Sequence, residues 1–437
     1  MLHLLIFISR FALVILLAFY TYSCFAALRS GISEEQQDFL YFRQTACMYM
    51  FILIANGILY LSTFEEQVLV MLGMELAFFI AVSLIYKHIY RNASLSVTNN
   101  MCMLLAISFI ILTRLDIDKA YKQLVIAGIS LAITCLIPFL VKKLKFLDRL
   151  TYVYAAVGIL GLGLVAVAGS TSYGAKLSLS IGGFSIQPSE FIKILFVFFV
   201  AAMLYDAGND RRKIEIATAV AGLHVLMLIA SRDLGGAGIF LLTYLVMLYV
   251  STQEPRFLLI GLTLGAVGMV CAYFLFGHVR NRVMAWKNPL SVVDGAGYQI
   301  SHSLFAIGTG GWFGSGLYQG MPEKIPVVEK DFVFSAISEE LGGVFALCLI
   351  FICISCFLMF FNIAMQIHDR FYKLIALGLG TVYATQTFLT LGGVTKFIPS
   401  TGVTLPLVSY GGSSLMSTMI LFAIIQGLYV MREEDGQ

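Results

Sequence analysis

Charged side chains are scarce in this chain. Of its 437 residues only 12% are Asp, Glu, Lys or Arg, whereas 59% are hydrophobic, and the mean hydropathy is +0.90. A soluble domain cannot bury so large an apolar fraction, so the composition excludes a soluble globular protein and places most of the chain in lipid. The sequence also lacks a low-complexity tract and a clear internal repeat, the second of which is common in transporters.

Metal-site spacing is absent as well. The eight cysteines all lie in apolar runs, none is spaced with histidine as in a zinc site, and the six histidines are scattered. The cysteines are therefore interpreted as small buried hydrophobic residues, and no zinc centre is expected. Basic residues flank the hydrophobic runs instead of gathering on one soluble face, which argues against a nucleic-acid partner.

Long hydrophobic runs make up most of the sequence. A spanning helix needs roughly 20 apolar residues, and thirteen such spans are predicted, centred near Val14, Ile52, Ala77, Ile107, Ala132, Leu160, Val197, Leu226, Tyr244, Thr263, Ile350, Gly380 and Ile420. The expected fold is an all-α polytopic membrane protein. A division near Val97 separates an N-terminal transmembrane extension of about three spans (1–96) from about ten spans (97–437), which carry all the motifs interpreted below.

The basic loops predict the orientation, because Lys and Arg accumulate on the cytoplasmic side. These loop and tail residues are Lys142, Lys143, Lys145, Arg149, Arg211, Arg212, Lys213, Arg370, Lys373 and Arg432. Placing them inside puts the C-terminus inside and Met1 outside. The same alternation puts loops 171–187, 277–332 and 390–411 outside.

Two short motifs open spans. In QPSEFIK (187–193), Pro188 suits the first position of a helix and Glu190 suits the positive end of its dipole. Glu190 and Lys193 share one helix face and can pair, and such a pair is costly in a membrane unless it faces a cavity or the bundle interior. We therefore expect it to have both a structural role and a role in supporting a substrate site. In RDLGGA (232–237), Asp233 is interpreted as part of a tight outer turn with a local ion pair.

The outer loop 277–332 is the most polar stretch of the chain. Its glycine-rich segments allow close approach of backbone to a ligand, and its Arg and Lys side chains suit phosphate oxygens. Asp294 is the only carboxylate between Arg282 and Glu323, and a carboxylate beside these cations could act as a general base. These features predict an anionic substrate on the outer face.

A second polar segment follows Lys396. Residues 399–414 carry two prolines and repeated hydroxyls within hydrophobic sequence. A broken segment of this kind is tolerated at membrane depth only against protein or a wet cavity. We expect it to form a re-entrant loop opposite the large outer loop.

Five motifs occur in a fixed order along the chain: QPSEFIK, RDLGGA, GYQISHSLFAIGTGGWFGSGL, KDFVFSAISEELG and TGVTLPLVSYGGSS. Over about residues 97–437 they resemble the SEDS family (shape, elongation, division and sporulation; the FtsW/RodA/SpoVE group). The resemblance implies a SEDS-type ten-helix bundle with about three extra N-terminal helices and a large extracellular loop. It implies a peptidoglycan glycosyltransferase that polymerises lipid II outside the bacterial cytoplasmic membrane, and a class B penicillin-binding protein, a transpeptidase, as partner.

The chain departs from the family at one position. The family's key aspartate usually stands in the pattern Asp-Pro-x-Gly-x-Gly-Tyr-Gln. Aligned on Gly297, Tyr298 and Gln299, the aspartate position holds Val292, and Asp294 lies two residues later. We hypothesise that Asp294 takes the proton from the sugar 4-hydroxyl of incoming lipid II, in an inverting transfer from a glycan on polyprenyl pyrophosphate.

The remaining site residues are assigned from their chemistry and from the motifs. The leaving pyrophosphate needs positive charge, for which Arg282 and Lys396 are preferred because they adjoin the motifs. The predicted substrate-binding residues are Arg280, Arg282, Lys287, Lys330, Lys396, Glu190, Lys193, Tyr298, Gln299, Ser409 and Ser413. A structural role is predicted for Pro188, Asp233, Gly297, Asp331, Glu339 and Glu340.

Four alternatives stay open. The cations could instead bind anionic headgroups of membrane lipids. A divalent cation, Mg²⁺ or Mn²⁺, could bridge the pyrophosphate, although the sequence shows no dedicated metal cage. The chain could also be a lipid II flippase, or a non-catalytic partner that recruits or activates a penicillin-binding protein.

Overall fold

The computed structural model describes residues 2–29, 31–144, 146–172, 175–181, 184–208 and 210–435. Lys145, one of the predicted cytoplasmic cations, and Met1 lie outside these ranges. The helices of the first half are α1 (Leu2–Ala26), α2 (Glu34–Thr63), α3 (Glu66–His88), α4 (Leu95–Leu115), α5 (Ile117–Thr134), α6 (Ile137–Lys143), α7 (Thr151–Ala168) and α8 (Pro188–Ala207). Those of the second half are α9 (Arg211–Ala230), α10 (Leu234–Thr252), α11 (Pro255–Leu275), α12 (Gly277–Lys287), α13 (Tyr298–Gly310), α14 (Val333–Gln366), α15 (Arg370–Val394) and α16 (Gly412–Asp435).

The all-α polytopic fold is confirmed. In the described part of the chain, twelve helices are long and apolar enough to cross a membrane, and they include twelve of the thirteen predicted centres. The thirteenth centre, Val197, lies in α8, which has 20 residues but carries Glu190, Lys193 and Asp206 and is not among the twelve. A 20-residue helix is about 30 Å long, which still matches the hydrocarbon thickness.

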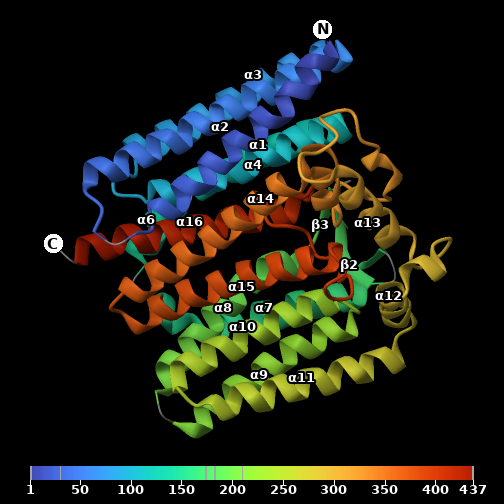
Figure 1. Cartoon of the computed structure of the whole chain (residues 1–437). Coiled ribbons are helices and arrows are strands. Elements are labelled where there is room, and N and C mark those ends of the chain that lie inside the picture. Colours follow the sequence, from blue (N-terminus) through green and yellow to red (C-terminus); the bar gives the residue numbers. More distant parts are fainter. Residues whose placement is uncertain are drawn as a thin grey trace.

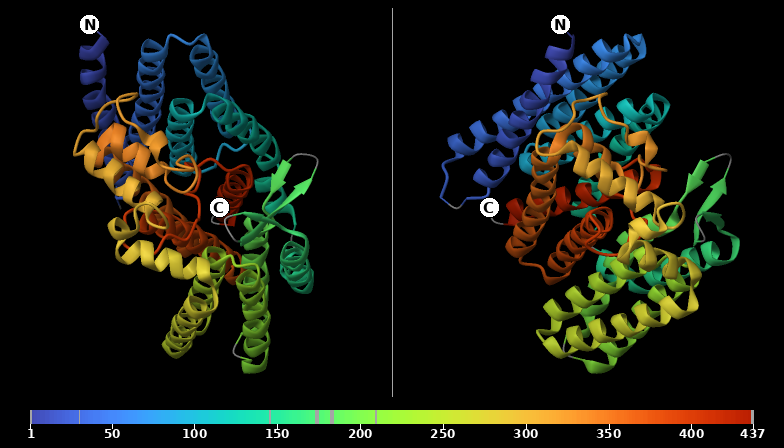
Figure 2. Two further views of the ribbon diagram at one scale, coloured as in Figure 1. Left: turned by 90° about the vertical axis from the view of Figure 1, so that its right-hand side faces the viewer. Right: turned by 45° about the vertical axis from the view of Figure 1, so that its right-hand side comes forward.

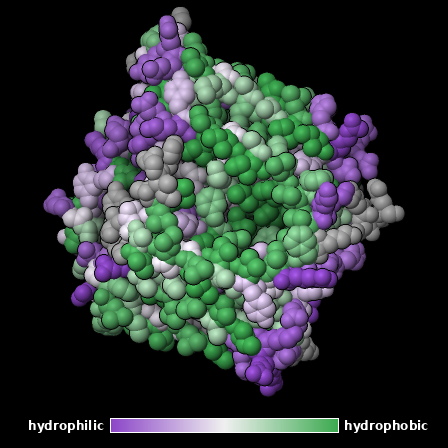
Figure 3. All heavy atoms as spheres, turned by 180° about the vertical axis from the view of Figure 1, so that it is seen from behind, coloured by the Kyte–Doolittle hydropathy of each residue, from purple (hydrophilic) through white to green (hydrophobic). Residues whose placement is uncertain are grey.

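The long helices lie side by side in one direction. Figure 1 shows α1–α3 along one edge, α9–α11 along the other, and α12, α13 and the strands at one end of the bundle, opposite the C-terminus. Seen from behind in Figure 3, hydrophobic side chains form a broad band that is hollowed near its middle, and hydrophilic side chains gather at the two ends. This distribution is what a bilayer requires of a spanning bundle.

The centre of the bundle is built from α4, α8, α15 and α16. Seventeen residues of α4 are buried, from Ser96 to Thr113, and α8 packs against α7, α9, α10, α15 and α16. A helix that is apolar on all sides is expected in such a position. Because α8 is enclosed by other helices, its charged N-terminal turn faces protein and not lipid.

A small antiparallel sheet fills the predicted outer loop 171–187. Its strands β1 (Ser170–Ser172), β2 (Ala175–Ile181) and β3 (Phe184–Ile186) pair in the order β1-β2-β3, and Figure 2 shows them standing out beside the helices. The sheet was not predicted, because its strands are short and rich in serine.

The N-terminal helices pack onto the rest of the bundle. Helix α1 contacts α2 and α14, α2 contacts α4, and α3 contacts α5. At the end of the bundle that carries α12 and α13, Arg10 donates a hydrogen bond of 3.0 Å to the Gly314 carbonyl, and Phe11 lies 5.3 Å from Phe313 between ring centroids. Helix α1 therefore holds residues 311–321, the segment that follows α13.

Candidate functional site

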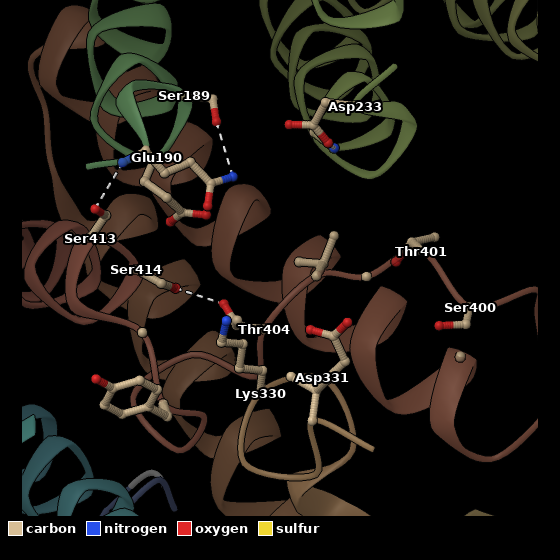
Figure 4. A pocket seen from close by; sticks show the side chains of 18 of the residues that line it. Ser189, Glu190, Asp233, Lys330, Asp331, Ser400, Thr401, Thr404, Ser413 and Ser414 are labelled. Carbon is tan, nitrogen blue, oxygen red and sulfur yellow. Dashed lines mark hydrogen bonds between the residues drawn. The ribbon is translucent and has the colours of Figure 1, made fainter. Parts of the chain in front are cut away.

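A cavity of about 1180 Å³ lies at the end of the bundle near α12 and α13. It is lined by residues from the starts of α8, α10 and α13, from α5 and α12, and from the segments 327–332 and 393–414. Figure 4 shows side chains from four of these parts converging on one space. The motifs at 187–193, 232–237 and 401–414, with the first residues of 330–342, therefore come together although they are far apart in sequence.

The wall formed by α8 carries a buried ion pair. Lys193 Nζ donates to Glu190 Oε2 at 2.5 Å and to Gln386 Oε1 at 2.7 Å, and Ser417 Oγ donates to the same Glu190 oxygen at 3.0 Å. Pro188 occupies the first turn of α8, as expected for a residue without an N–H. Each charged group of this wall thus has partners within the protein, while both residues line the cavity.

Asp233 forms the opposite wall and caps α10. Its Oδ1 accepts the Gly236 N–H at 2.8 Å, so it satisfies one of the free donors at the helix start. Burial raises the pKa of Asp233 above its ordinary value, while the Gly236 N–H and the charges of Arg282 and Lys193 oppose that rise.

Arg282 reaches the cavity from α12. Its Nη1 donates to the Thr401 carbonyl at 2.8 Å, which ties the large outer loop to the polar segment after α15. Burial lowers the pKa of this guanidinium from its ordinary value, against the attraction of Asp331 and Asp233. A β-carbon at Gly402 would lie 3.1 Å from Arg282 Nη2, and the Gly402 φ is +73°, so glycine allows both the backbone turn and the close approach.

Lys330 and Asp331 enter from the segment that precedes α14. The Lys330 carbonyl accepts a hydrogen bond from Ser409, and the Glu329 carbonyl accepts the Tyr410 N–H at 2.8 Å. In Figure 4 the Asp331 carboxylate points into the space between Glu190 and Asp233, and the Lys330 side chain runs toward Thr404. Burial raises the pKa of Asp331 above its ordinary value, although Arg282 and Lys330 oppose the rise.

The polar segment after α15 is not helical up to the start of α16 and packs inside the protein. Gln386 Nε2 donates to the Thr404 carbonyl at 3.1 Å, Thr390 donates to the Val403 carbonyl at 2.9 Å, and the Thr404 and Ser414 hydroxyls are 2.8 Å apart. Ser413 accepts the Gln187 N–H at 3.0 Å. Side chains of the surrounding helices thus satisfy backbone groups that a break in a helix leaves free.

Several predicted site residues lie outside the cavity. Asp294 is exposed and is not among the described residues that line it, so its role as base stays a prediction. Arg280 and Lys287 are exposed, and Tyr298 packs on His302. Lys396 offers its backbone carbonyl to Trp286, Ser409 is buried behind Lys330, and Gly297 precedes α13. Arg282, Lys330, Glu190, Lys193, Gln299 and Ser413 do line the cavity.

Glu339 and Glu340 face away from the cavity. Glu339 accepts the Met321 N–H at 3.0 Å, and Glu340 pairs with Arg114 at 2.8 Å. Helix α14 breaks at Gly342, where φ is 90° and a β-carbon would lie 2.3 Å from the Gly314 nitrogen. These contacts fasten residues 311–321 to α14, in keeping with the structural role predicted for both glutamates.

The described residues do not form a metal cage. No group of three or more His, Cys, Asp or Glu side chains converges among them. Glu190 is already bonded to Lys193 and Ser417, and Asp233 to Gly236. This donor set does not fit a resident divalent cation.

Other lining residues were missed from the sequence. Helix α5 contributes Tyr121, Lys122, Val125, Ile126 and Ile129, which share one helix face by their spacing. Val125 and Ile129 are each 52% exposed, so the polar cavity continues into an apolar outer surface. Gln386 does not line the cavity but bonds Lys193 and the Thr404 carbonyl, and it was missed too. A glutamine within an apolar helix is the signal that could have indicated it.

The chain matches known proteins over most of its length. A family model described as "Cell cycle protein" (FtsW/RodA/SpoVE) matches residues 94–434. The peptidoglycan glycosyltransferase RodA of Mycobacterium tuberculosis is 37% identical over 325 residues, covering 70% of this chain and 69% of its own. Stage V sporulation protein E of Bacillus subtilis is 33% identical over 276 residues, covering 61% of this chain and 74% of its own.

Solved structures agree in fold. A chain from a structure titled "Structural coordination of polymerization and crosslinking by a peptidoglycan synthase complex" aligns with a TM-score of 0.66 and 25% identity, covering 79% of this chain and 99% of that one. The rod shape determining protein RodA of Thermus thermophilus aligns with a TM-score of 0.60 and 24% identity, covering 77% and 96%. The motifs, the helical bundle and the match over residues 94–434 together make this chain a member of the FtsW/RodA/SpoVE family.

Proposed function

We propose that this chain is a peptidoglycan glycosyltransferase that polymerises lipid II at the cavity between α8, α10, α12 and the segment 393–414. The observation that carries the proposal is the lining of the cavity. It contains both cations and carboxylates, and it continues onto the apolar outer face of α5. A substrate that carries a prenyl chain on a pyrophosphate-linked sugar needs both surfaces at once. The relatives named peptidoglycan glycosyltransferase support this activity.

Three cations of the cavity lining support this proposal. Arg282 is fixed to the Thr401 carbonyl by Nη1, which leaves Nη2 beside Gly402 at the cavity. Arg282 and Lys330 both line the cavity, and we assign them to stabilise the charge on the leaving pyrophosphate. Lys193 is held by Glu190 and Gln386, so its charge is fixed in place. Removing one such donor typically costs about 10²–10³ in kcat.

The orientation and the partner are part of the proposal. The basic loops predict that the cavity end, with α12 and α13, faces outside and that the C-terminus is cytoplasmic. In Figure 1, α12 and α13 lie at the end of the bundle opposite the C-terminus, as this orientation requires. The similarity to a chain of a peptidoglycan synthase complex supports a class B penicillin-binding protein as partner.

Purified full-length chain in vesicles, alone and with a class B penicillin-binding protein, tests the activity with fluorescent lipid II added outside. Glycan ladders are the expected product. Lipid II that crosses the bilayer without forming polymer would instead indicate a flippase. If the chain neither polymerises nor transports lipid II but stimulates the transpeptidase, it is a non-catalytic partner. This outcome needs to be measured because Val292 stands at the position of the family's key aspartate.

A further inference from the structure

We propose that Asp331 is the proton acceptor of this site, the catalytic base that takes the hydrogen of the acceptor sugar hydroxyl. This inference rests on the proposed glycosyltransferase activity. It assigns the base to a residue that sequence reasoning placed in a structural role. It follows from the positions of four carboxylates, of which three line the cavity and one, Asp294, does not.

The other two cavity carboxylates are already engaged. Glu190 Oε2 accepts hydrogen bonds from Lys193 and Ser417, so its negative charge balances the buried Lys193. Asp233 holds the start of α10 through Gly236. Protonating Glu190 would remove the counter-charge of the buried Lys193, and protonating Asp233 would weaken its cap on α10, so both groups are better suited to stay ionised than to take up a proton.

Asp331 is free and points into the cavity. In the described structure its carboxylate oxygens make no hydrogen bond and no ion pair, although burial raises its pKa. Figure 4 shows this carboxylate directed at the central space, with Glu190 and Asp233 on the far sides. The side chain is partly exposed and lines the cavity, so its oxygens are open to a bound ligand. Substrate contact is the simplest function for a group held in this state.

The backbone around Asp331 is fixed from both sides. Ser409 bonds the Lys330 carbonyl, and Tyr410 bonds the Glu329 carbonyl. Asp331 immediately precedes Phe332, the cap residue of α14. A catalytic group has to be held close to its productive position by its supporting shell, and these contacts supply that shell.

Arg282 stands beside Asp331 without pairing with it. A β-carbon at Gly402 would lie 3.1 Å from Arg282 Nη2 and 3.6 Å from Asp331 Oδ2. Both side chains therefore lie next to this glycine. One cation and one free carboxylate therefore meet at one edge of the cavity. That arrangement suits a reaction in which a proton leaves one oxygen while negative charge grows on another.

The step balances as a single displacement. The acceptor hydroxyl oxygen attacks the anomeric carbon of the donor and forms the glycosidic bond, while the bond from that carbon to the pyrophosphate oxygen breaks. The bonding electron pair leaves with the polyprenyl pyrophosphate, beside Arg282 and Lys330. The hydroxyl proton passes to the Asp331 carboxylate, which later releases it to water.

The test compares Asp331→Asn with Asp294→Asn in the vesicle assay with fluorescent lipid II. We expect Asp331→Asn to lower kcat by about 10²–10⁴ with little change in lipid II binding, and by more than Asp294→Asn does. Asp118→Asn, an exposed acid of α5 outside the site, is the control and should polymerise like the wild type. Asp331→Glu keeps the carboxylate and should recover part of the rate. If Asp331→Asn polymerises normally, or if Asp294→Asn alone abolishes polymer, Asp331 is not the base.

A pH profile separates a base from a structural residue. The base works deprotonated, so the wild-type rate should fall as pH drops through the raised pKa of Asp331, and this acidic limb should be lost in Asp331→Asn. The groups around Asp331 that influence the profile are Arg282, Lys330, Glu329, Glu190, Asp233 and Lys193. A variant that unfolds at lower temperature, binds lipid II weakly and keeps the wild-type limb would show a structural role and overturn the proposal. A wild type that yields no polymer would instead refute the proposed function.

Discussion

At the residue scale, the cavity depends on charges that are buried beside their partners. Lys193 is 3% exposed and has two acceptors, Glu190 and Gln386. Taking such a cation out of water is costly, and the cost is offset only while its partners remain. The pair therefore stabilises the α8 wall only as a unit.

Glu190→Gln should destabilise the protein more than the double variant Glu190→Gln, Lys193→Met. The single change leaves a buried cation without its counter-charge, which typically costs about 3–5 kcal/mol, whereas the double change removes both charges. Thermal unfolding in detergent measures the difference. A double variant that melts below the single one would show that the pair is not coupled in this way.

Much of the site could be predicted one residue at a time. Glu190, Lys193, Arg282 and Lys330 stand out because charges are rare in this chain, and each lies at the cavity. From the sequence, Asp294 was predicted as the base and Asp331 as a structural residue, since nothing in a polar loop indicates which acid turns inward. The backbone that carries Asp331 is held from another part of the chain, because Ser409 and Tyr410 donate to the Lys330 and Glu329 carbonyls.

At the scale of elements, helix α1 is joined to the outer segment 311–321. The family match begins at residue 94, so α1–α3 lie outside it. The contact of Arg10 with the Gly314 carbonyl and that of Phe11 with Phe313 connect α1 to this segment. The segment is bonded in turn to Glu339 and to the Glu340 carbonyl in α14. The spans of α1–α3 were predicted from hydropathy, but their docking was not, since apolar helices give no signal of which neighbour they choose.

Arg10→Ala should loosen residues 311–321 without unfolding the helices. A hydrogen bond from a charged group contributes about 1.5–3 kcal/mol, so amide exchange in this segment should speed up by about tenfold or more. Hydrogen exchange with mass spectrometry measures it. Lys87→Ala, at the exposed end of α3, is the matched control and should leave the segment unchanged. Equal exchange rates in both variants would show that Arg10 does not hold this segment in place.

At the scale of the whole molecule, the bundle is polar at two ends and apolar between them. The alternation of spans and the basic loops predict that α12 and α13 face outside and that the α14–α15 turn faces inside. Composition and hydropathy were enough to predict this architecture. They missed the strands β1–β3, which are too short and polar to give an apolar pattern.

Single cysteines test that orientation in a background carrying Cys271→Ser, because Cys271 is the exposed cysteine in the described structure. Ser291→Cys, near the outer loop, should react with a membrane-impermeant maleimide on intact cells. His368→Cys, in the α14–α15 turn, should react only after permeabilisation. Both positions are exposed, so the opposite labelling pattern would place the cavity inside the cell.

The central claim is that the cavity is where lipid II is polymerised, and two arginines of α12 test it most directly. Arg282 lines the cavity and bonds the Thr401 carbonyl, whereas Arg280, one half-turn away, is exposed and outside the lining. Glycan ladder formation should fall by about 10²–10³ in Arg282→Ala and stay near the wild-type rate in Arg280→Ala. Full activity in Arg282→Ala, with the fold intact, would contradict the account.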